Sequence, residues 1–243
     1  AAYLEILPPN AKTRVPADLT AHLSGKALPL DRFSWGLRTL IAFGPEEKTG
    51  RKTLVVQTGG KKHEFNFDLG RADFQTFRSS INLGEYSDAA KQEKPEVLAF
   101  IKKCQEKKVR VFSRVTTDML SNRLAHPRET HNVTSPFYCK RIVDRFRTEK
   151  GKKVTLAPWV NIHNGLDLGG TSGEPIYAMA DGRVVIAEKM HYEGNFVSLD
   201  HGNGIFSGYL HQSALNVKEG QTVKAGELLG RVGATGMATG PHL

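Results

Sequence analysis

The stretch His163-Asn164-Gly165-Leu166-Asp167 decides how the rest of the chain is interpreted. The Asn-Gly pair inside it disfavours a helix, so we place His163 and Asp167 on an extended segment or a turn. Imidazole and carboxylate groups are the usual non-thiol ligands of zinc. Two further histidines, His211 and His242, lie on strand-like segments later in the chain. The combination predicts a site that binds a metal and moves protons.

Short glycine-rich motifs follow this stretch in a fixed order. They continue as far as the last residue, Leu243. In chain order, the motifs are Gly173-Glu174-Pro175-Ile176-Tyr177-Ala178, Ala180-Asp181-Gly182-Arg183-Val184, Gly194-Asn195-Phe196-Val197, Asp200-His201-Gly202-Asn203-Gly204, Tyr209-Leu210-His211, Gly233-Ala234-Thr235-Gly236 and Thr239-Gly240-Pro241-His242-Leu243.

The ordered set resembles the LytM/lysostaphin-type zinc metallopeptidases, which cut the peptide part of bacterial peptidoglycan. The resemblance covers about residues 134–243, and the first motif of the family, His-x-Gly-x-Asp, matches His163, Gly165 and Asp167. It implies that His163 and Asp167 are zinc ligands. It also implies that His211 and His242 are catalytic: they position or deprotonate the attacking water and stabilise the oxyanion.

Members of this family end the motif run with His-x-His, and the second His is the third zinc ligand. The sequence given stops at Leu243, one residue before that position. We expect the natural protein to continue, since a final strand normally follows in the family. With His163 and Asp167 as the only ligands, zinc affinity is expected to be lower and activity impaired.

The segment before the metal motif departs from the family pattern. Thr134-Ser135-Pro136-Phe137 matches the usual Thr-Ser-x-Phe, but Tyr138 stands where a Gly is typical and Lys140 where an Arg is typical. The Tyr138 departure leaves the local backbone open, because Gly reaches conformations that Tyr avoids.

The remaining sequence predicts a mainly β protein with three parts. Residues 1–75 contain short alternating strands broken by Gly and Pro turns, which predicts a small β-sandwich, similar to the immunoglobulin-like domain that family members often carry. Residues 76–127 are predicted to be a partly helical connector, and residues 125–129 are expected to be an exposed boundary. Residues 128–243, where nearly every segment after Gly182 alternates between strand and turn, are expected to form an antiparallel β peptidase domain of the LytM type.

The predicted connector contains one clear helix. Pro95 and Glu96 fall in its first turn and Lys102 and Lys103 near its end, at residues 94–104. Residues 109–115 fit either a strand or a continuation of this helix. If the connector holds the front domain over the active site, deleting residues 1–127 should raise activity.

The charge of the chain is +9 and uneven. Residues 1–127 hold 21 Lys and Arg against 14 Asp and Glu, a net +7, which leaves +2 for residues 128–243. A basic front half could attract wall polymers, membranes or nucleic acid, or it could simply be a solvated surface. No zinc-finger spacing, aromatic RNA-binding motif or basic helical repeat accompanies it, so we expect no nucleic-acid partner.

Composition also bears on location. No apolar run is long enough to span a bilayer, and the sequence starts without a signal-like stretch, so any signal peptide has been removed. With peptidoglycan as the expected partner, we predict a periplasmic or secreted protein.

Cys104 and Cys139 could pair or remain free thiols, and the oligomeric state is left open.

Two other hypotheses compete with that of a peptidase. A non-catalytic relative that binds wall or regulates another hydrolase usually lacks the zinc residues, whereas His163, Asp167, His211 and His242 are all present. Residues 217–228 resemble part of a lipoyl- or biotin-carrier domain, but no acceptor Lys stands at a hairpin tip. We attribute that likeness to a shared β-hairpin architecture.

Overall fold

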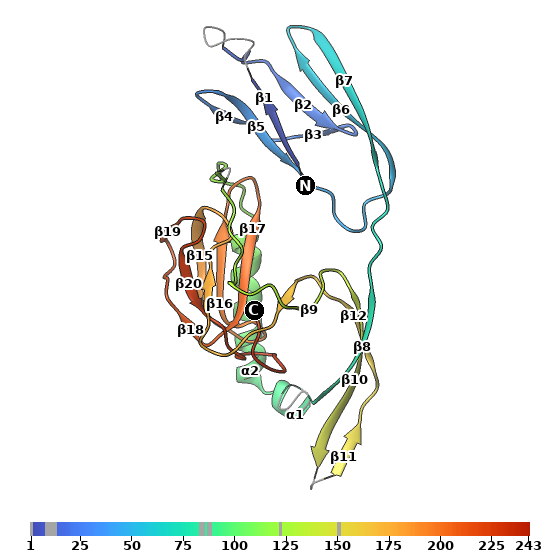
Figure 1. Ribbon diagram of the computed structural model, residues 1–243, viewed down its shortest axis with the longest axis vertical. Coiled ribbons are helices and arrows are strands. Elements are labelled where there is room, and N and C mark those ends of the chain that lie inside the picture. Colours follow the sequence, from blue (N-terminus) through green and yellow to red (C-terminus); the bar gives the residue numbers. More distant parts are fainter. Residues whose placement is uncertain (1, 8–13, 83–85, 87–88, 122, 150–151) are drawn as a thin grey trace. The chain divides into compact units, whose positions relative to one another are not determined.

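The computed structural model describes residues 2–7, 14–82, 86, 89–121, 123–149 and 152–243 (Figure 1). The protein is mainly β, as predicted, and divides into two compact units, residues 1–73 and residues 74–243. Each unit is described by itself. None of the described helices is long and apolar enough to cross a membrane.

The N-terminal unit consists of two antiparallel sheets. Its buried apolar side chains, Ala21, Leu37, Ile41 and Leu54, come from both sheets. The assignment of an immunoglobulin-like sandwich to residues 1–75 remains a prediction. One sheet has the order β1-β5-β4, made of β1 (Ala2–Ile6), β5 (Gly36–Ile41) and β4 (Asp31–Phe33), and the other the order β3-β2-β6-β7, made of β3 (Lys26–Ala27), β2 (Thr20–Leu23), β6 (Gly50–Thr58) and β7 (Lys61–Leu69).

The C-terminal unit is built on two further sheets that share a core. The strand orders are β17-β16-β15-β19 and β14-β20-β18. These strands are β14 (Pro175–Tyr177), β15 (Gly182–Met190), β16 (Gly194–Asp200), β17 (Phe206–Gln212), β18 (Ala214–Leu215), β19 (Thr222–Val223) and β20 (Leu228–Arg231). The core cluster comprises Ile176, Ala178, Val184, Val197, Leu199, Tyr209, Val217, Val223, Leu229 and Val232. Strands from both sheets therefore contribute to one core, and in β16 five successive residues, 196–200, are buried.

Smaller sheets stand next to this core. The two-residue strand β13 (Asp167–Leu168) pairs with β9 (Val133–Ser135). The long strand β10 (Lys140–Glu149) pairs with β11 (Lys152–Thr155), with β12 (Trp159–Ile162) and, in parallel, with β8 (Thr76–Asn82). Residues 76–82, expected to belong to a connector, are thus a strand of the C-terminal unit.

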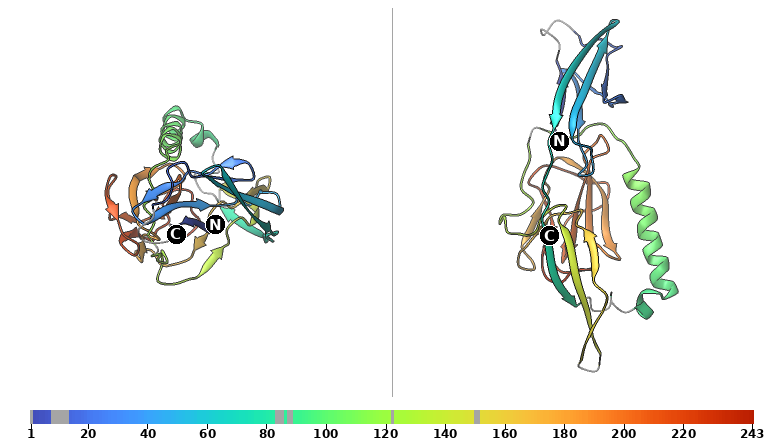
Figure 2. Two further views of the ribbon diagram at one scale, coloured as in Figure 1. Left: turned by 90° about the horizontal axis from the view of Figure 1, so that it is seen from above. Right: turned by 90° about the vertical axis from the view of Figure 1, so that its right-hand side faces the viewer.

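The predicted helix is present and longer than expected. A short helix α1 (Ala89–Gln92) precedes α2 (Pro95–Phe112), which begins at Pro95 with Glu96 in its first turn and ends with Arg110 in its last. Residues 109–112 therefore continue the helix. Cys104 and Val111 of α2 are buried with Ile186, Met190 and Phe196, so the helix packs along β15 and β16 (Figure 2).

The segment after α2 also lies against the C-terminal unit. The Met119 N–H donates to the His201 carbonyl, and the Ala125 N–H donates to the Met179 carbonyl. Arg128, which the sequence placed at an exposed boundary, is only 3% exposed and forms an ion pair with Glu174. That expectation was wrong at Arg128, because the guanidinium finds a carboxylate and a backbone carbonyl inside the fold.

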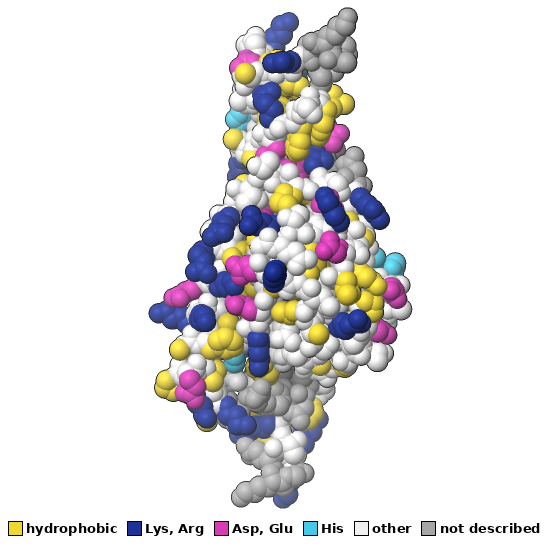
Figure 3. All heavy atoms as spheres, turned by 90° about the vertical axis from the view of Figure 1, so that its left-hand side faces the viewer, with side chains coloured by type: hydrophobic (Ala, Val, Ile, Leu, Met, Phe, Trp, Pro, Cys, Tyr) yellow, Lys and Arg dark blue, Asp and Glu magenta, His cyan; other side chains and the backbone are white. Residues whose placement is uncertain are grey.

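Basic side chains are interspersed with other types on one face of the protein (Figure 3). On the face that Figure 3 draws, Lys and Arg side chains stand among acidic and apolar ones. Several of the lysines of α2 are paired with carboxylates, as shown by Lys107 with Glu188 and Lys108 with Glu193.

Removing residues 1–127 should destabilise the C-terminal unit, whereas removing residues 1–73 should not. The longer deletion takes away β8, α2 and the segment that follows. The loss of Val111 burial alone is worth about 1.5–3 kcal/mol. Urea unfolding followed by Trp159 fluorescence checks this, and equal stability of the two truncated forms would contradict it. Whether the front domain lowers activity by covering the active site is therefore properly tested by deleting residues 1–73.

Candidate metal and catalytic site

His163 and Asp167 flank a tight turn between two strands. His163 directly follows β12, and Asp167 is the first residue of β13, so the expected extended-or-turn placement is confirmed. His163 Nε2 lies 3.1 Å from Asp167 Oδ1. A Cβ at Gly165 would approach that Nε2 to 3.3 Å, so the absence of a side chain there leaves the imidazole unobstructed.

Asp167 is a half-buried carboxylate held from two sides. Its Oδ1 faces His163, and its Oδ2 accepts a hydrogen bond from Arg141 Nη2 at 2.5 Å. Burial raises the pKa of Asp167, but the hydrogen bond and charge of His163, together with the charges of Arg141 and His242, outweigh it and lower the pKa below its usual value. The carboxylate is therefore ionised at neutral pH.

The His163 ring has a partner for either neutral tautomer. Its Nδ1 lies 3.0 Å from the Pro136 carbonyl oxygen and 2.9 Å from Arg141 Nη2. When Nδ1–H donates to Pro136, the lone pair of Nε2 faces Asp167 Oδ1. Two electron-pair donors then face one another at 3.1 Å, an arrangement that a cation between them would relieve.

His211 occupies an irregular position in β17. The β16–β17 register shifts between Asn195 and Val197, and His211 has a φ of 62°, which is rare for a residue other than glycine. Its backbone N–H donates to the Glu193 carbonyl, and its Nδ1 lies 2.8 Å from the Thr235 carbonyl oxygen. Nδ1 therefore carries the proton, which leaves Nε2 as a proton acceptor.

His242 is brought beside these groups by the last residues of the chain. Leu168 and Leu243 exchange backbone hydrogen bonds of 2.8 and 2.9 Å, which lays the final segment along β13. The rings of His242 and His211 lie 4.8 Å apart, and the charge of His242 acts on Asp167. The fold thus gathers the four residues singled out in the sequence.

Burial controls the protonation of His211. It lowers the pKa of His211 below its ordinary value; the Thr235 carbonyl opposes this effect, and the neighbouring His242 adds to it. His211 is therefore neutral at pH 7. The Nδ1 of His242 lies 2.8 Å from the Gly240 carbonyl oxygen, which likewise directs its proton away from Nε2.

Sequence reasoning missed Arg141, which contacts both His163 and Asp167 as well as Ser135. The nearest sequence signal was Tyr138 in a Gly position. Tyr138 does adopt a left-handed conformation, with a φ of 57°, and its N–H donates to the His163 carbonyl. The backbone that Gly usually provides is therefore kept, and β10 starts where Arg141 can reach the site.

The donors present fit zinc by their chemistry. An imidazole nitrogen and an ionised carboxylate oxygen are both common zinc ligands. Across the described part of the chain, no group of three or more His, Cys, Asp or Glu side chains is arranged to hold a metal ion. The described donors are thus the pair His163 and Asp167.

A known protein family matches the part of the chain that contains these residues. Residues 161–243 match the model described as Peptidase family M23. This part of the chain is an M23 peptidase domain. The matched residues include His163, Asp167, His211 and His242.

Individual relatives share this domain. Peptidoglycan DD-endopeptidase ShyA of Vibrio cholerae is 46% identical over 81 residues, 33% of this chain and 19% of ShyA. Glycyl-glycine endopeptidase ALE-1 of Staphylococcus capitis is 41% identical over 83 residues, 33% of this chain and 23% of ALE-1. The alignments thus span about a fifth of these curated relatives.

A solved structure extends the likeness beyond the M23 domain. A crystal structure described as that of a peptidase M23 from Pseudomonas aeruginosa has a TM-score of 0.60 and 27% identity. The alignment covers 92% of this chain and 79% of that one.

Several buried side chains of the C-terminal unit have structural surroundings. His201 is 2% exposed; its Nδ1 donates to the Asp181 carbonyl, and its Nε2 lies 2.8 Å from Ser207 Oγ. Cys104 and Cys139 are both buried and free.

His201 should make the M23 domain less stable in acid. Burial lowers its pKa although the Asp181 carbonyl opposes the shift, so the unfolded chain binds the proton first. Its contribution to stability is complete above about pH 6.5, where an unfolded histidine titrates, and is lost as the pH falls towards the folded pKa. His201→Gln should therefore flatten the dependence of unfolding free energy on pH between 7 and 5. The exposed His63→Gln is the control, and identical pH slopes would contradict the prediction.

Proposed function

We propose that the M23 domain is a zinc-dependent endopeptidase that cleaves the peptide cross-links or stems of bacterial peptidoglycan. The observation that carries the proposal is the convergence of His163 Nε2 and Asp167 Oδ1 at 3.1 Å, with the rings of His211 and His242 beside them. The printed names of the relatives, which are peptidoglycan and glycyl-glycine endopeptidases, support the same class of substrate.

His163 and Asp167 would hold the zinc ion. Bound there, zinc supplies Lewis acidity that makes a water nucleophilic at neutral pH and polarises a carbonyl. Arg141 orients this pair, because its guanidinium donates to Asp167 Oδ2 and directs Oδ1 towards His163. The Pro136 carbonyl holds the His163 tautomer whose Nε2 lone pair is available.

His211 and His242 would handle protons and charge. His211 is neutral at pH 7 and offers a free Nε2, which is what a general base needs. Protonated after accepting a proton, the same ring can donate to the leaving amine. The ring of His242 lies beside it, with Nδ1–H held by the Gly240 carbonyl. In its protonated form this ring also carries a proton on Nε2, which can donate to negative charge that develops on the carbonyl oxygen.

Substrate and location follow from this chemistry as part of the proposal. Peptidoglycan lies outside the cytoplasmic membrane, so the protein would act in the cell envelope, either periplasmic or secreted. The names of ShyA and ALE-1 point to different bonds, a DD bond and a glycyl-glycine bond. The bond cut by this chain is therefore a matter for product analysis.

The proposal predicts zinc binding and wall cleavage that both depend on His163. The protein should be expressed with any natural residues that flank the present sequence. Its zinc content and its release of peptides from purified peptidoglycan are then measured. We expect about one zinc per chain, loss of zinc and activity in His163→Ala, and loss of activity with retained zinc in His211→Ala. A zinc-free protein would refute the enzyme assignment. A zinc-loaded protein that cuts nothing would point to a regulator.

Arg141 should strengthen zinc binding by orienting Asp167. In Arg141→Gln, the Asp167 carboxylate loses the partner that fixes its Oδ2. We expect zinc affinity to fall about 10- to 100-fold. Competition with a chromophoric chelator measures this. The matched control is Arg145→Gln on the same strand, since Arg145 donates to the Ala157 carbonyl. Unchanged or tighter binding in Arg141→Gln would contradict the positioning role.

A further inference from the structure

The turn at residues 191–194 holds the backbone on which His211 stands. The Glu193 carbonyl accepts the N–H of His211 at 2.8 Å, and the Tyr192 carbonyl accepts the N–H of Met237 at 2.8 Å. A side chain at Gly194, which has a φ of 67°, would collide with Thr235. The turn is therefore in close contact with the backbone of His211 and with the segment at Thr235, both of which position the His211 ring.

His211 needs this support because its backbone is strained. A non-glycine residue with a φ of 62° keeps that conformation only when its surroundings determine it. Three contacts do so here: the bond from its N–H to the Glu193 carbonyl, the approach of its Nδ1 to the Thr235 carbonyl, and the bond from the Thr235 N–H to the His211 carbonyl. A shift of the turn would act on the first contact directly.

The other side of the same turn is held by the connector. The Tyr86 hydroxyl donates to the His191 carbonyl, and His191 Nε2 lies 2.9 Å from Gln92 Oε1. The rings of Tyr86 and Phe100 lie 5.5 and 6.1 Å from the His191 ring. Tyr86, Gln92 and Phe100 thus contact His191, the first residue of the turn.

An ion pair completes the link between α2 and the turn. Lys108 Nζ is paired with Glu193, and their side chains are only 19% and 13% exposed. Glu193 therefore has two roles: its carboxylate is held by the helix, and its backbone carbonyl holds His211. Without Lys108, this largely buried carboxylate would have to move towards water to be solvated.

We propose that the connector positions His211 through the turn at residues 191–194, with Lys108 as the positioning residue. The inference rests on the proposed function, in which His211 is catalytic. Residues 86–112 follow the N-terminal unit in the chain. Any partner or movement that displaces α2 would therefore change the alignment of His211 and, with it, the rate of peptide cleavage.

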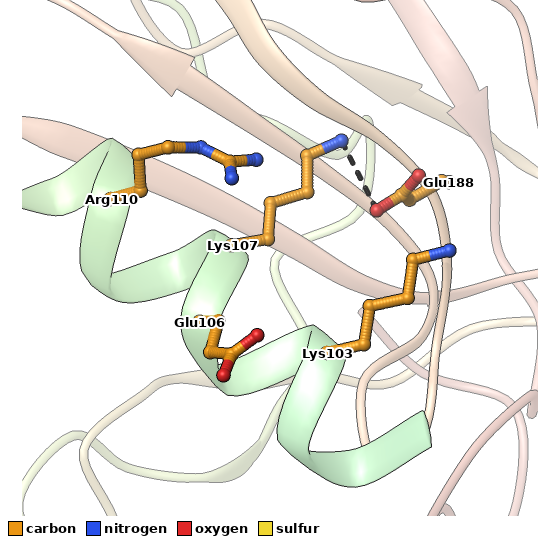
Figure 4. Close-up of a pocket in the computed structure, with 5 residues that line it drawn as sticks. All are labelled: Lys103, Glu106, Lys107, Arg110 and Glu188. Carbon is orange, nitrogen blue, oxygen red and sulfur yellow. Dashed lines mark ion pairs between the residues drawn. The ribbon is translucent and has the colours of Figure 1, made fainter. Parts of the chain in front are cut away.

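Lys107 provides a matched control. It is the neighbour of Lys108 on α2, is 16% exposed, and is paired with Glu188 at 3.1 Å (Figure 4) and with Glu219 at 2.7 Å. Among the contacts of the described residues, neither carboxylate is bonded to the turn at residues 191–194 or to His211. Both lysines tie α2 to the M23 domain, but only Lys108 ties it to the support of His211.

The experiment compares Lys108→Met, Lys107→Met and Lys108→Arg in the full chain. One readout is amide exchange of the peptide that contains His211. The other is kcat and KM on soluble cross-linked muropeptides. For Lys108→Met we expect exchange about two- to fivefold faster, the size expected for loss of a partly buried ion pair. We also expect kcat about tenfold lower with KM unchanged, because misplacement of a catalytic group lowers turnover. Lys107→Met should match the wild type in both, and Lys108→Arg should restore both.

The outcomes separate this inference from the proposed function. If the wild type cuts muropeptides and Lys108→Met behaves like Lys107→Met in both readouts, the positioning role is wrong. A fall in kcat without faster exchange at His211 would also overturn it. If the wild type cuts nothing, the proposed function fails, and amide exchange alone still decides whether Lys108 fixes the backbone at His211.

Discussion

The partly buried carboxylate of Asp167 is the group on which the site depends. A carboxylate removed from water stays ionised only where opposite charges and hydrogen-bond donors compensate for the lost solvation. His163 and Arg141 provide that compensation, one for each oxygen. Satisfying this one charge also fixes β13, against which the last residues of the chain pair, and so brings His242 into place.

The second constraint is backbone strain at His211. On a regular strand, a side chain stands roughly perpendicular to the sheet. The register shift and the left-handed conformation of His211 instead let its Nδ1 meet the Thr235 carbonyl. Conformations of this kind occur at functional sites, where the surrounding structure keeps them in place. Here the turn at residues 191–194 does so, and the connector in turn supports that turn.

The connector is therefore part of the C-terminal unit in structural terms. Its strand β8 pairs with β10, and Cys104 and Val111 of α2 are buried against β15 and β16. A protein built this way can transmit a change in the connector to the site without rearranging the core. The physical coupling passes through a few polar contacts, and polar contacts respond to charge and to displacement more readily than close-packed side chains do.

The sequence by itself determined what depends on residue type and local spacing. Alternation and Gly turns predicted the β-rich C-terminal unit, Pro95 and Glu96 predicted the start of α2, and Asn164-Gly165 predicted the turn between His163 and Asp167. Each follows from the conformational preferences of neighbouring residues, which act whatever the rest of the chain does.

Only the tertiary structure decided which distant groups meet. Nothing near Arg141 in the sequence indicates that it contacts Asp167, and nothing distinguishes Lys108 from Lys107 before the fold places one beside Glu193 and the other beside Glu188. Likewise, Arg128 was expected to be exposed and is buried. Ion pairs between residues far apart in the chain depend on packing geometry, and that geometry leaves no local trace in composition or periodicity.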